Sequence, residues 1–468
     1  MQPPFPVNPG KSCLAAAFAA GLVLTCSQPG IALSRQRLAQ AGPIVLSAPD
    51  RVASSVHLET KGETTRLIFD LTEKVPASAF ALADPDRVII DLPEVNFQID
   101  PAVGQVARPG ARRPAGRRAA TAPSAMALSG VVGSFRFGLF APGKSRIVID
   151  LAEPARITKV VTEGEDAAAR LVIELQRSDR ATFLAAARKP TRLPEAVAAI
   201  PAPATPLPTS NKPLIVLDAG HGGVDTGARS PDGTLEKDIV FEFSKALEAE
   251  LEGSGRYRVL MTRATDIFVP LGDRVKIARN AGAALFVSIH ADTLAGEPGV
   301  SGATVYTVSD KASDSEAARV AESENQADLV AGLESQEEQS EVSDILFDLT
   351  RRETRAFSHV FARTLIGYWK DIGRLNKNPQ RAAGFRVLKA PDVPSVLLEL
   401  GYLSSDKDLQ GLVTPAWRQR AAGTVAKAID QFFRSRGIRD QADHPTSDLG
   451  LRPGSAGSES GNVAATIR

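Results

Sequence analysis

The stretch that decides the fold reads Leu-Ile-Val-Leu-Asp-Ala-Gly-His-Gly-Gly and covers residues 214–223. Its first half is a continuous apolar run of strand length, and its second half is a glycine-rich turn that contains His221. Short apolar runs of this kind are typical of strands that are buried on both faces. Two similar runs end at His290 and at Glu399. Helical patterns alternate with these strands, so residues 213–436 are predicted to form an α/β domain.

Four polar side chains at the ends of these patterns suggest a chemistry. His221 and His290 each follow an apolar run, and Glu236 opens a helical pattern downstream of His221. Two imidazoles and a carboxylate can hold a zinc ion and leave one position open for water. Glu399 closes the third run and supplies a separate carboxylate that can move protons. Together these residues indicate a zinc-dependent amide hydrolase.

Each of these residues also has a structural interpretation, and a single histidine at a strand end, such as His290, is usually an ordinary surface residue. The turn around His221 could cradle a phosphate, although no Lys-Ser/Thr pair and no G-x-G-x-x-G spacing follows it. Glu236 would be favoured in a first helical turn by the helix dipole alone. Glu399 could be a buried hydrogen-bond acceptor. Asp218 could accept a hydrogen bond from a ligand histidine and fix its tautomer, or could satisfy backbone groups in the turn.

Length and composition limit the other possibilities. A chain of 468 residues predicts two folded units joined by linkers. The formal net charge of +1 gives no general attraction to nucleic acid, and the aromatic content of 5% argues against base stacking. We therefore expect no nucleic-acid partner.

The amino terminus predicts a secretory signal. Lys11 precedes an apolar stretch over 13–25, which is too short to span a bilayer, and Ala32 suits cleavage. Cleavage at Ala39 or Ala41 is an alternative, so we assign 1–41 to a signal peptide and leader. Both cysteines, Cys13 and Cys26, lie inside this segment. The mature protein would then have no disulfide, no transmembrane anchor and a periplasmic location.

A repeated pattern organises the first half of the chain. Four copies consist of an arginine, three apolar residues, an acid and a leucine, and they begin at Arg66, Arg87, Arg146 and Arg170. Each copy predicts a short strand, and the two pairs of copies suggest an all-β sandwich over 45–180.

Three polar or proline-rich segments separate or flank these units. A basic insertion at about 100–129 interrupts the all-β unit and has a disordered composition. A proline- and alanine-rich linker covers 181–212. A glycine- and serine-rich tail, also of disordered composition, covers 437–468.

Residues 213 to about 435 resemble the zinc-dependent N-acetylmuramoyl-L-alanine amidases of the amidase-3 family. Four stretches carry the likeness in order, at 217–223, 236–238, 288–292 and 387–399. The resemblance implies that His221, Glu236 and His290 bind one zinc ion, that Glu399 is the catalytic glutamate, and that a twisted mixed sheet is covered by helices. Asp292 stands where many members have asparagine, and it could add an oxygen ligand.

The resemblance extends to two further segments. The first half is similar to the AMIN domain, which targets such enzymes to peptidoglycan. Cell-division amidases carry an insertion, here at about 311–350, whose helix covers the active site and is displaced by degenerate LytM-domain activators. The first predicted helix covers about 313–331, and the second about 344–369. The likeness predicts autoinhibition, with Glu316 or Glu322 blocking the open zinc position.

The resemblance therefore predicts hydrolysis of the amide bond between N-acetylmuramic acid and L-alanine in septal peptidoglycan. Two alternatives stay open on the sequence alone. One is a zinc peptidase or deacetylase that acts on another cell-wall bond, and the other is a non-catalytic wall-binding protein. The presence of every expected ligand and of the acid/base carboxylate argues against the second alternative.

Overall fold

The computed structural model describes residues 51–105, 128–165, 168–187, 211–293, 300–333 and 345–437. The predicted leader, most of the basic insertion, most of the proline-rich linker and nearly all of the tail lie outside the described residues. Among the described helices, none is both long enough and apolar enough to cross a membrane.

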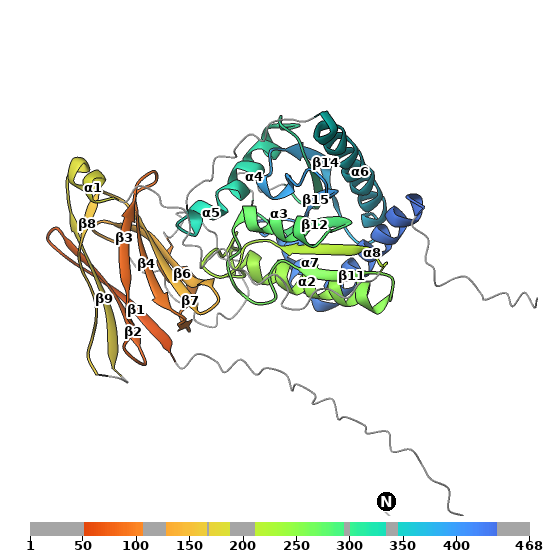
Figure 1. Cartoon of the computed structure of the whole chain (residues 1–468). Helices are drawn as coiled ribbons and strands as arrows, with labels where there is room; N and C mark the ends of the chain where they lie inside the picture. Colours follow the sequence, from red (N-terminus) through yellow and green to blue (C-terminus); the bar gives the residue numbers. More distant parts are fainter. Residues whose placement is uncertain are drawn as a thin grey trace, which may run out of the picture. The chain divides into compact units, whose positions relative to one another are not determined.

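The described residues of the first half form mainly strands (Figure 1). Two sheets form, with the strand orders β5-β1-β2-β9-β8 and β3-β4-β7-β6. The elements are β1 Val52–Lys61, β2 Thr64–Leu71, β3 Ser78–Leu82, β4 Arg87–Pro93, β5 Asn96–Phe97, η1 Pro101–Gly104, β6 Val132–Ala141, β7 Lys144–Leu151, β8 Ala155–Glu163, β9 Ala169–Arg177 and α1 Arg180–Ala186.

The four sequence repeats lie in β2, β4, β7 and β9, where they pair differently from their order in the chain. The first copy pairs with the fourth, and the second pairs with the third, each time antiparallel. The register places Arg66 opposite Glu174, and Arg146 opposite Asp91. Both pairs form ion contacts, at 2.7 and 2.6 Å. In these two pairs the repeated arginine and acid are cross-strand partners. In each copy the first and third apolar residues fill a core that both sheets share, while the middle one lies outside that core.

The second half contains one six-stranded sheet and its helices. The strands are β10 Leu214–Ala219, β11 Arg258–Met261, β12 Leu285–His290, β13 Ala303–Val308, β14 Leu375–Ala383 and β15 Ser395–Glu399. The helices are α2 Glu236–Gly253, α3 Leu271–Asn280, α4 Ser315–Asn325, α5 Ala327–Val330, α6 Ile345–Trp369, η2 Arg386–Leu388, α7 Asp406–Leu412 and α8 Pro415–Ser435.

The strand order is β11-β10-β12-β15-β13-β14. Neighbouring strands are parallel except for β13 and β15, which pair antiparallel. This arrangement confirms the predicted mixed sheet. The carboxyl ends of β10, β12 and β15 meet at one edge, with His290 in register with Glu399. That edge is where an open α/β sheet binds its ligands.

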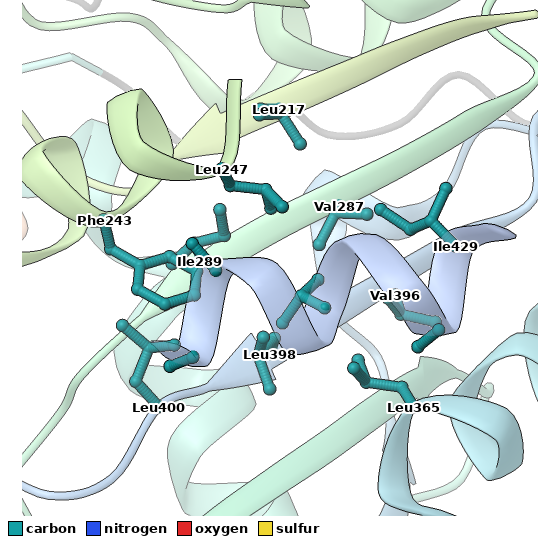
Figure 2. Close-up of a cluster of buried hydrophobic side chains, with 14 of the residues drawn as sticks. Leu217, Phe243, Leu247, Val287, Ile289, Leu365, Val396, Leu398, Leu400 and Ile429 are labelled. Atoms are coloured by element: carbon teal, nitrogen blue, oxygen red, sulfur yellow. The ribbon is translucent and has the colours of Figure 1, made fainter. Parts of the chain in front are cut away.

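Two apolar clusters cover the two faces of the sheet. One face packs against α2, α6 and α8, and Figure 2 shows part of this cluster, with Phe243 and Leu247 of α2 and Ile429 of α8 beside the strand residues. The other face packs against α3, α4 and the segment around η2. Burial on both faces explains why the strands are apolar throughout.

The predicted helical insertion is present with altered boundaries. Residues 313–331 were expected to form a single helix, but the helix is interrupted at Gln326, between α4 and α5. The second predicted helix matches α6, which begins at Ile345 and ends at Trp369.

Candidate metal centre

Four buried side chains meet at the carboxyl edge of the sheet. His221, Glu236, His290 and Glu324 each offer one donor atom, and these atoms lie within 4.8 Å of one another. His221 Nε2 lies 3.2 Å from Glu236 Oε2 and 3.5 Å from Glu324 Oε2. His290 Nδ1 lies 3.2 Å from Glu236 Oε1 and 3.0 Å from Glu324 Oε2.

The distances between the donor atoms resemble those between the ligands of a bound zinc ion. Ligands bound at about 2.0–2.1 Å to a tetrahedral zinc ion stand roughly 3.3 Å from one another. The four imidazole-to-carboxylate distances of 3.0–3.5 Å therefore suit one small divalent cation. Nε2 of His221 is buried and has no hydrogen-bond partner, which also fits a ligand atom. The structure thus brings together the three side chains that the sequence singled out, and it adds a fourth, Glu324.

His221 is held by the turn that follows β10. Its φ of +56° lies in the left-handed region, which non-glycine residues seldom adopt. Nδ1 of His221 lies 2.9 Å from Oδ2 of Asp225, so this carboxylate orients the ring and leaves Nε2 facing the cluster. The suggestion that Asp218 plays this part is wrong. Asp218 bonds to Thr262, Ser288 and Arg274 instead, because its side chain lies among these polar groups in the interior.

Glu236 is the first residue of α2 and is fully buried. Its carboxylate accepts hydrogen bonds from the backbone N–H groups of Ala228 and Ala291, both at 2.8 Å. Burial opposes the charge, but His221 and His290 outweigh it and hold the pKa of Glu236 well below its usual value. Glu236 is therefore ionised, as a metal ligand must be.

The two imidazoles attract protons in this acidic surrounding. Burial lowers the pKa of His290, but the Glu324 and Glu236 carboxylates outweigh it and raise the value to about 10. Burial likewise opposes the charge on His221, yet Glu236, Asp225 and Glu324 raise its pKa well above the usual value. A site with this much negative charge favours any cation, whether protons or a metal ion.

Glycines provide the room that the cluster needs. A Cβ atom at Gly220 would lie 2.4 Å from the His290 ring. A Cβ atom at Gly227, where φ is +63°, would lie 2.6 Å from the His221 ring and 2.7 Å from Oε2 of Glu236. Both glycines are therefore required by close approach of the backbone to the donor side chains.

Glu399 ends β15 beside His290 and is fully buried. Its Oε2 accepts a hydrogen bond from the Asp292 backbone N–H at 3.1 Å, whereas Oε1 has no partner. Burial raises the pKa of Glu399 well above its usual value, with Asp292 and Glu236 adding to the effect. A carboxyl with a raised pKa and a free oxygen next to the donor cluster can exchange protons with a bound water.

Asp292 stands apart from the donor cluster. Across the described residues, the group of four donors does not include it. Its Oδ1 accepts a hydrogen bond from the Thr293 N–H at 2.5 Å. Burial, together with the charges of Glu324 and Glu236, raises its pKa to about 8.

The fourth donor comes from the insertion, but from a different residue than expected. Glu316 pairs with Arg381 at 2.8 Å, and Glu322 is exposed. Glu324 is 5% exposed and faces the two histidines. The helix period explains this, because Glu324 shares the buried face of α4 with residues three, four and seven positions earlier, namely Ala321, Val320 and Ala317. That spacing was readable in the sequence.

Known proteins are similar to this chain over most of its length. The family model described as N-acetylmuramoyl-L-alanine amidase matches residues 215–431. The N-acetylmuramoyl-L-alanine amidase AmiC of Escherichia coli O6:H1 is 31% identical over 86% of this chain and 96% of its own length. AmiC of Neisseria meningitidis serogroup B is 30% identical over 79% and 87%, respectively. Among solved structures, AmiC2 of Nostoc punctiforme matches 48% of this chain and 99% of its own, at 26% identity and a TM-score of 0.36.

The likeness to the two AmiC proteins covers most of all three chains, and the family model spans the sheet that carries the donor cluster. The chain belongs to the family of N-acetylmuramoyl-L-alanine amidases.

Proposed function

We propose that this protein is a zinc-dependent amidase that cleaves the bond between N-acetylmuramic acid and L-alanine in peptidoglycan. The observation that carries the proposal is the cluster of His221, Glu236 and His290, whose donor atoms lie within 4.8 Å of one another, with an unpartnered carboxyl oxygen on Glu399 at the same edge of the sheet. These three residues would hold the ion. When bound there, zinc would supply Lewis acidity toward the scissile carbonyl and toward a water molecule.

The chain's own residues supply the proton transfers. Glu399 Oε1 would accept the proton of the attacking water and deliver it to the alanine nitrogen as the C–N bond breaks. A nearby cation would lower the pKa that burial has raised, so that Glu399 is ionised when it acts as the base. Asp225 keeps the His221 ring in place, and the backbone N–H of Asp292 keeps Glu399 in place.

The presence of Glu324 supports autoinhibition. Four protein donors close a metal site, whereas a catalytic site keeps one position for water or substrate. Glu324 occupies the fourth corner of the donor cluster from the inserted helix α4, so the described conformation would be inactive. Activity then requires α4 to leave the site. We propose that an activator of the degenerate LytM type brings this about.

The remaining parts of the proposal concern where the enzyme works. The strands over Val52–Arg177 would form the AMIN-like domain that binds peptidoglycan. A chain of this family with a cleavable leader would act in the periplasm, where it would split septal wall between daughter cells. The AmiC relatives match both halves of the chain, which supports this arrangement.

The test is product analysis after digestion of purified sacculi by the zinc-loaded full chain and by its Glu324→Ala variant. Mass spectrometry should find stem peptides with a free alanine amino group and intact glycan strands, and a chelator should abolish their release. Cleavage between two amino acids would indicate a peptidase, and release of acetate would indicate a deacetylase. Absence of any product from both zinc-loaded proteins would refute the proposal.

A further inference from the structure

Two arginines with almost no exposed surface lie directly behind the turn that carries His221. Arg263 and Arg274 are each 2% exposed. Burying a guanidinium group is costly unless its donors are satisfied. Most of the acceptors that satisfy these two groups are backbone carbonyls within residues 219–221 and 237, next to the candidate metal ligands.

Arg263 joins the segments of two candidate ligands. Its Nη2 donates to the Gly220 carbonyl at 3.1 Å and to the Lys237 carbonyl at 2.9 Å. Gly220 immediately precedes His221, and Lys237 immediately follows Glu236. Its Nε donates to the Ala219 carbonyl at 3.0 Å. A single planar group therefore fixes the turn after β10 relative to the first turn of α2.

Arg274 holds the same turn from α3. Its Nη1 donates to Ala219 O at 2.9 Å, and its Nη2 donates to His221 O at 2.9 Å. The bond to His221 O restrains a residue whose φ is +56°. A backbone in this region persists only where its surroundings hold it. Nε of Arg274 is bound to Val269 O at 2.8 Å, so the guanidinium cannot turn away.

Asp218 extends this network to the third candidate ligand. Its Oδ1 accepts from Nη1 of Arg274 at 2.8 Å, and its Oδ2 accepts from the Ser288 hydroxyl at 2.7 Å. Ser288 lies two residues before His290 on β12. Burial would raise the pKa of Asp218, but Arg274 and the two hydroxyl bonds hold it below the usual value, so the carboxylate stays charged. The network thus reaches the segments of all three ligands.

We propose that Arg263 and Arg274 are positioning residues that preorganise the zinc site through main-chain carbonyls, without touching the ion. This inference rests on the proposed zinc-dependent function. Carboxylates that accept hydrogen bonds from ligand histidines orient the imidazole ring, and these arginines would do the same for the backbone that carries the ligands. Purely structural arginines would affect folding stability without affecting the zinc affinity of the folded protein.

The test compares zinc dissociation constants of the full chain, measured by competition with a chromophoric chelator. Arg263→Met should bind zinc about 10- to 100-fold more weakly, which is the usual loss when a residue that orients a metal ligand is removed. Arg263→Lys keeps the charge but lacks the planar set of N–H donors, so its zinc dissociation constant should lie between those of wild type and Arg263→Met. Arg256→Met is the matched control, because Arg256 precedes the same strand β11 at its other end and pairs with Asp430.

A second readout separates positioning from folding. The melting temperature of each variant is measured with chelator and with zinc, and the proposal predicts that the rise caused by zinc shrinks in the Arg263 variants but not in Arg256→Met. If Arg263→Met does not fold, the lysine variant decides alone. A zinc dissociation constant within about twofold of wild type for folded Arg263 variants would overturn the proposal, and so would an equal weakening in Arg256→Met. Failure of the wild-type chain to bind zinc would instead refute the proposed function.

Discussion

Replacing Glu324 by alanine should release the enzyme from its inactive state. In the described conformation the Glu324 carboxylate lies 3.0 Å from Nδ1 of His290 and 3.5 Å from Nε2 of His221. Hydrogen bonds to charged groups contribute about 1.5–3 kcal/mol each. Loss of one such interaction would raise the open population about 10- to 150-fold, since each 1.4 kcal/mol is roughly a factor of ten.

The gain should be smaller than that from deleting the whole segment 313–343. Other contacts of the insertion remain in Glu324→Ala, because Asn325 still binds Gly384 O at 2.9 Å and Asp328 still accepts from the Leu271 N–H at 3.0 Å. These bonds would keep α4 over the donor cluster in part of the variant molecules. Deletion removes them together with the carboxylate.

The assay is release of dye from labelled sacculi by zinc-loaded protein without an activator. Glu322→Ala is the matched control, because Glu322 lies on the same helix but is exposed, and its activity should equal that of wild type. A basal rate in Glu324→Ala no higher than wild type, at equal zinc content, would refute the reasoning. If zinc is lost as well, Glu324 is a permanent ligand rather than a removable one.

Three further predictions concern the site itself. Gly227→Ala should lose zinc binding, whereas Gly62→Ala, also at positive φ but with nothing within 4 Å of the added Cβ, should bind zinc as wild type does in the same chelator competition. Glu399→Gln should retain stoichiometric zinc by metal analysis and lose hydrolysis, and full activity would remove Glu399 from the mechanism. Because zinc must displace the proton of His290, whose metal-free pKa is about 10, the apparent zinc affinity should keep rising between about pH 6 and 9; a plateau above about pH 7 would contradict this.

The sequence predicted the site residues that stand at the end of a recognisable apolar run or at the start of a helical pattern. Apolar runs that end in His290 and Glu399 indicate the ends of buried strands, because strands buried on both faces are apolar throughout. Glu324 was missed in favour of its neighbours Glu316 and Glu322, although the spacing from Ala317 places it on the buried face. Asp225 belongs to neither an apolar run nor a helical pattern, so nothing in the sequence singled it out. Its partnership with His221 depends on the tight turn between them, where Gly222 N–H bonds to Asp225 O at 2.8 Å.

The burial of Arg263 and Arg274 could not be predicted from the sequence, for a different reason. Arginine in a sequence normally predicts an exposed charge, and backbone carbonyl acceptors carry no residue signature. Their burial follows only from the tertiary arrangement, in which the ends of β10 and β11 and the start of α3 enclose both guanidinium groups. In the all-β half, likewise, the repeat predicted strands but not that the first copy pairs with the fourth.

The proposed autoinhibition requires that α4 can leave the site, and the apolar part of its attachment is small. On its buried face α4 contributes small apolar side chains, Ala317, Val320 and Ala321, whose burial is worth about 3–5 kcal/mol at roughly 0.8 kcal/mol per carbon group. The Glu324 carboxylate adds about 1.5–3 kcal/mol to the closed state. A partner that binds the displaced segment must therefore supply a difference in affinity of several kcal/mol between the two states, which a modest protein interface can provide. Under the proposed autoinhibition, the small apolar residues of α4 would make the block easier to reverse than large ones would.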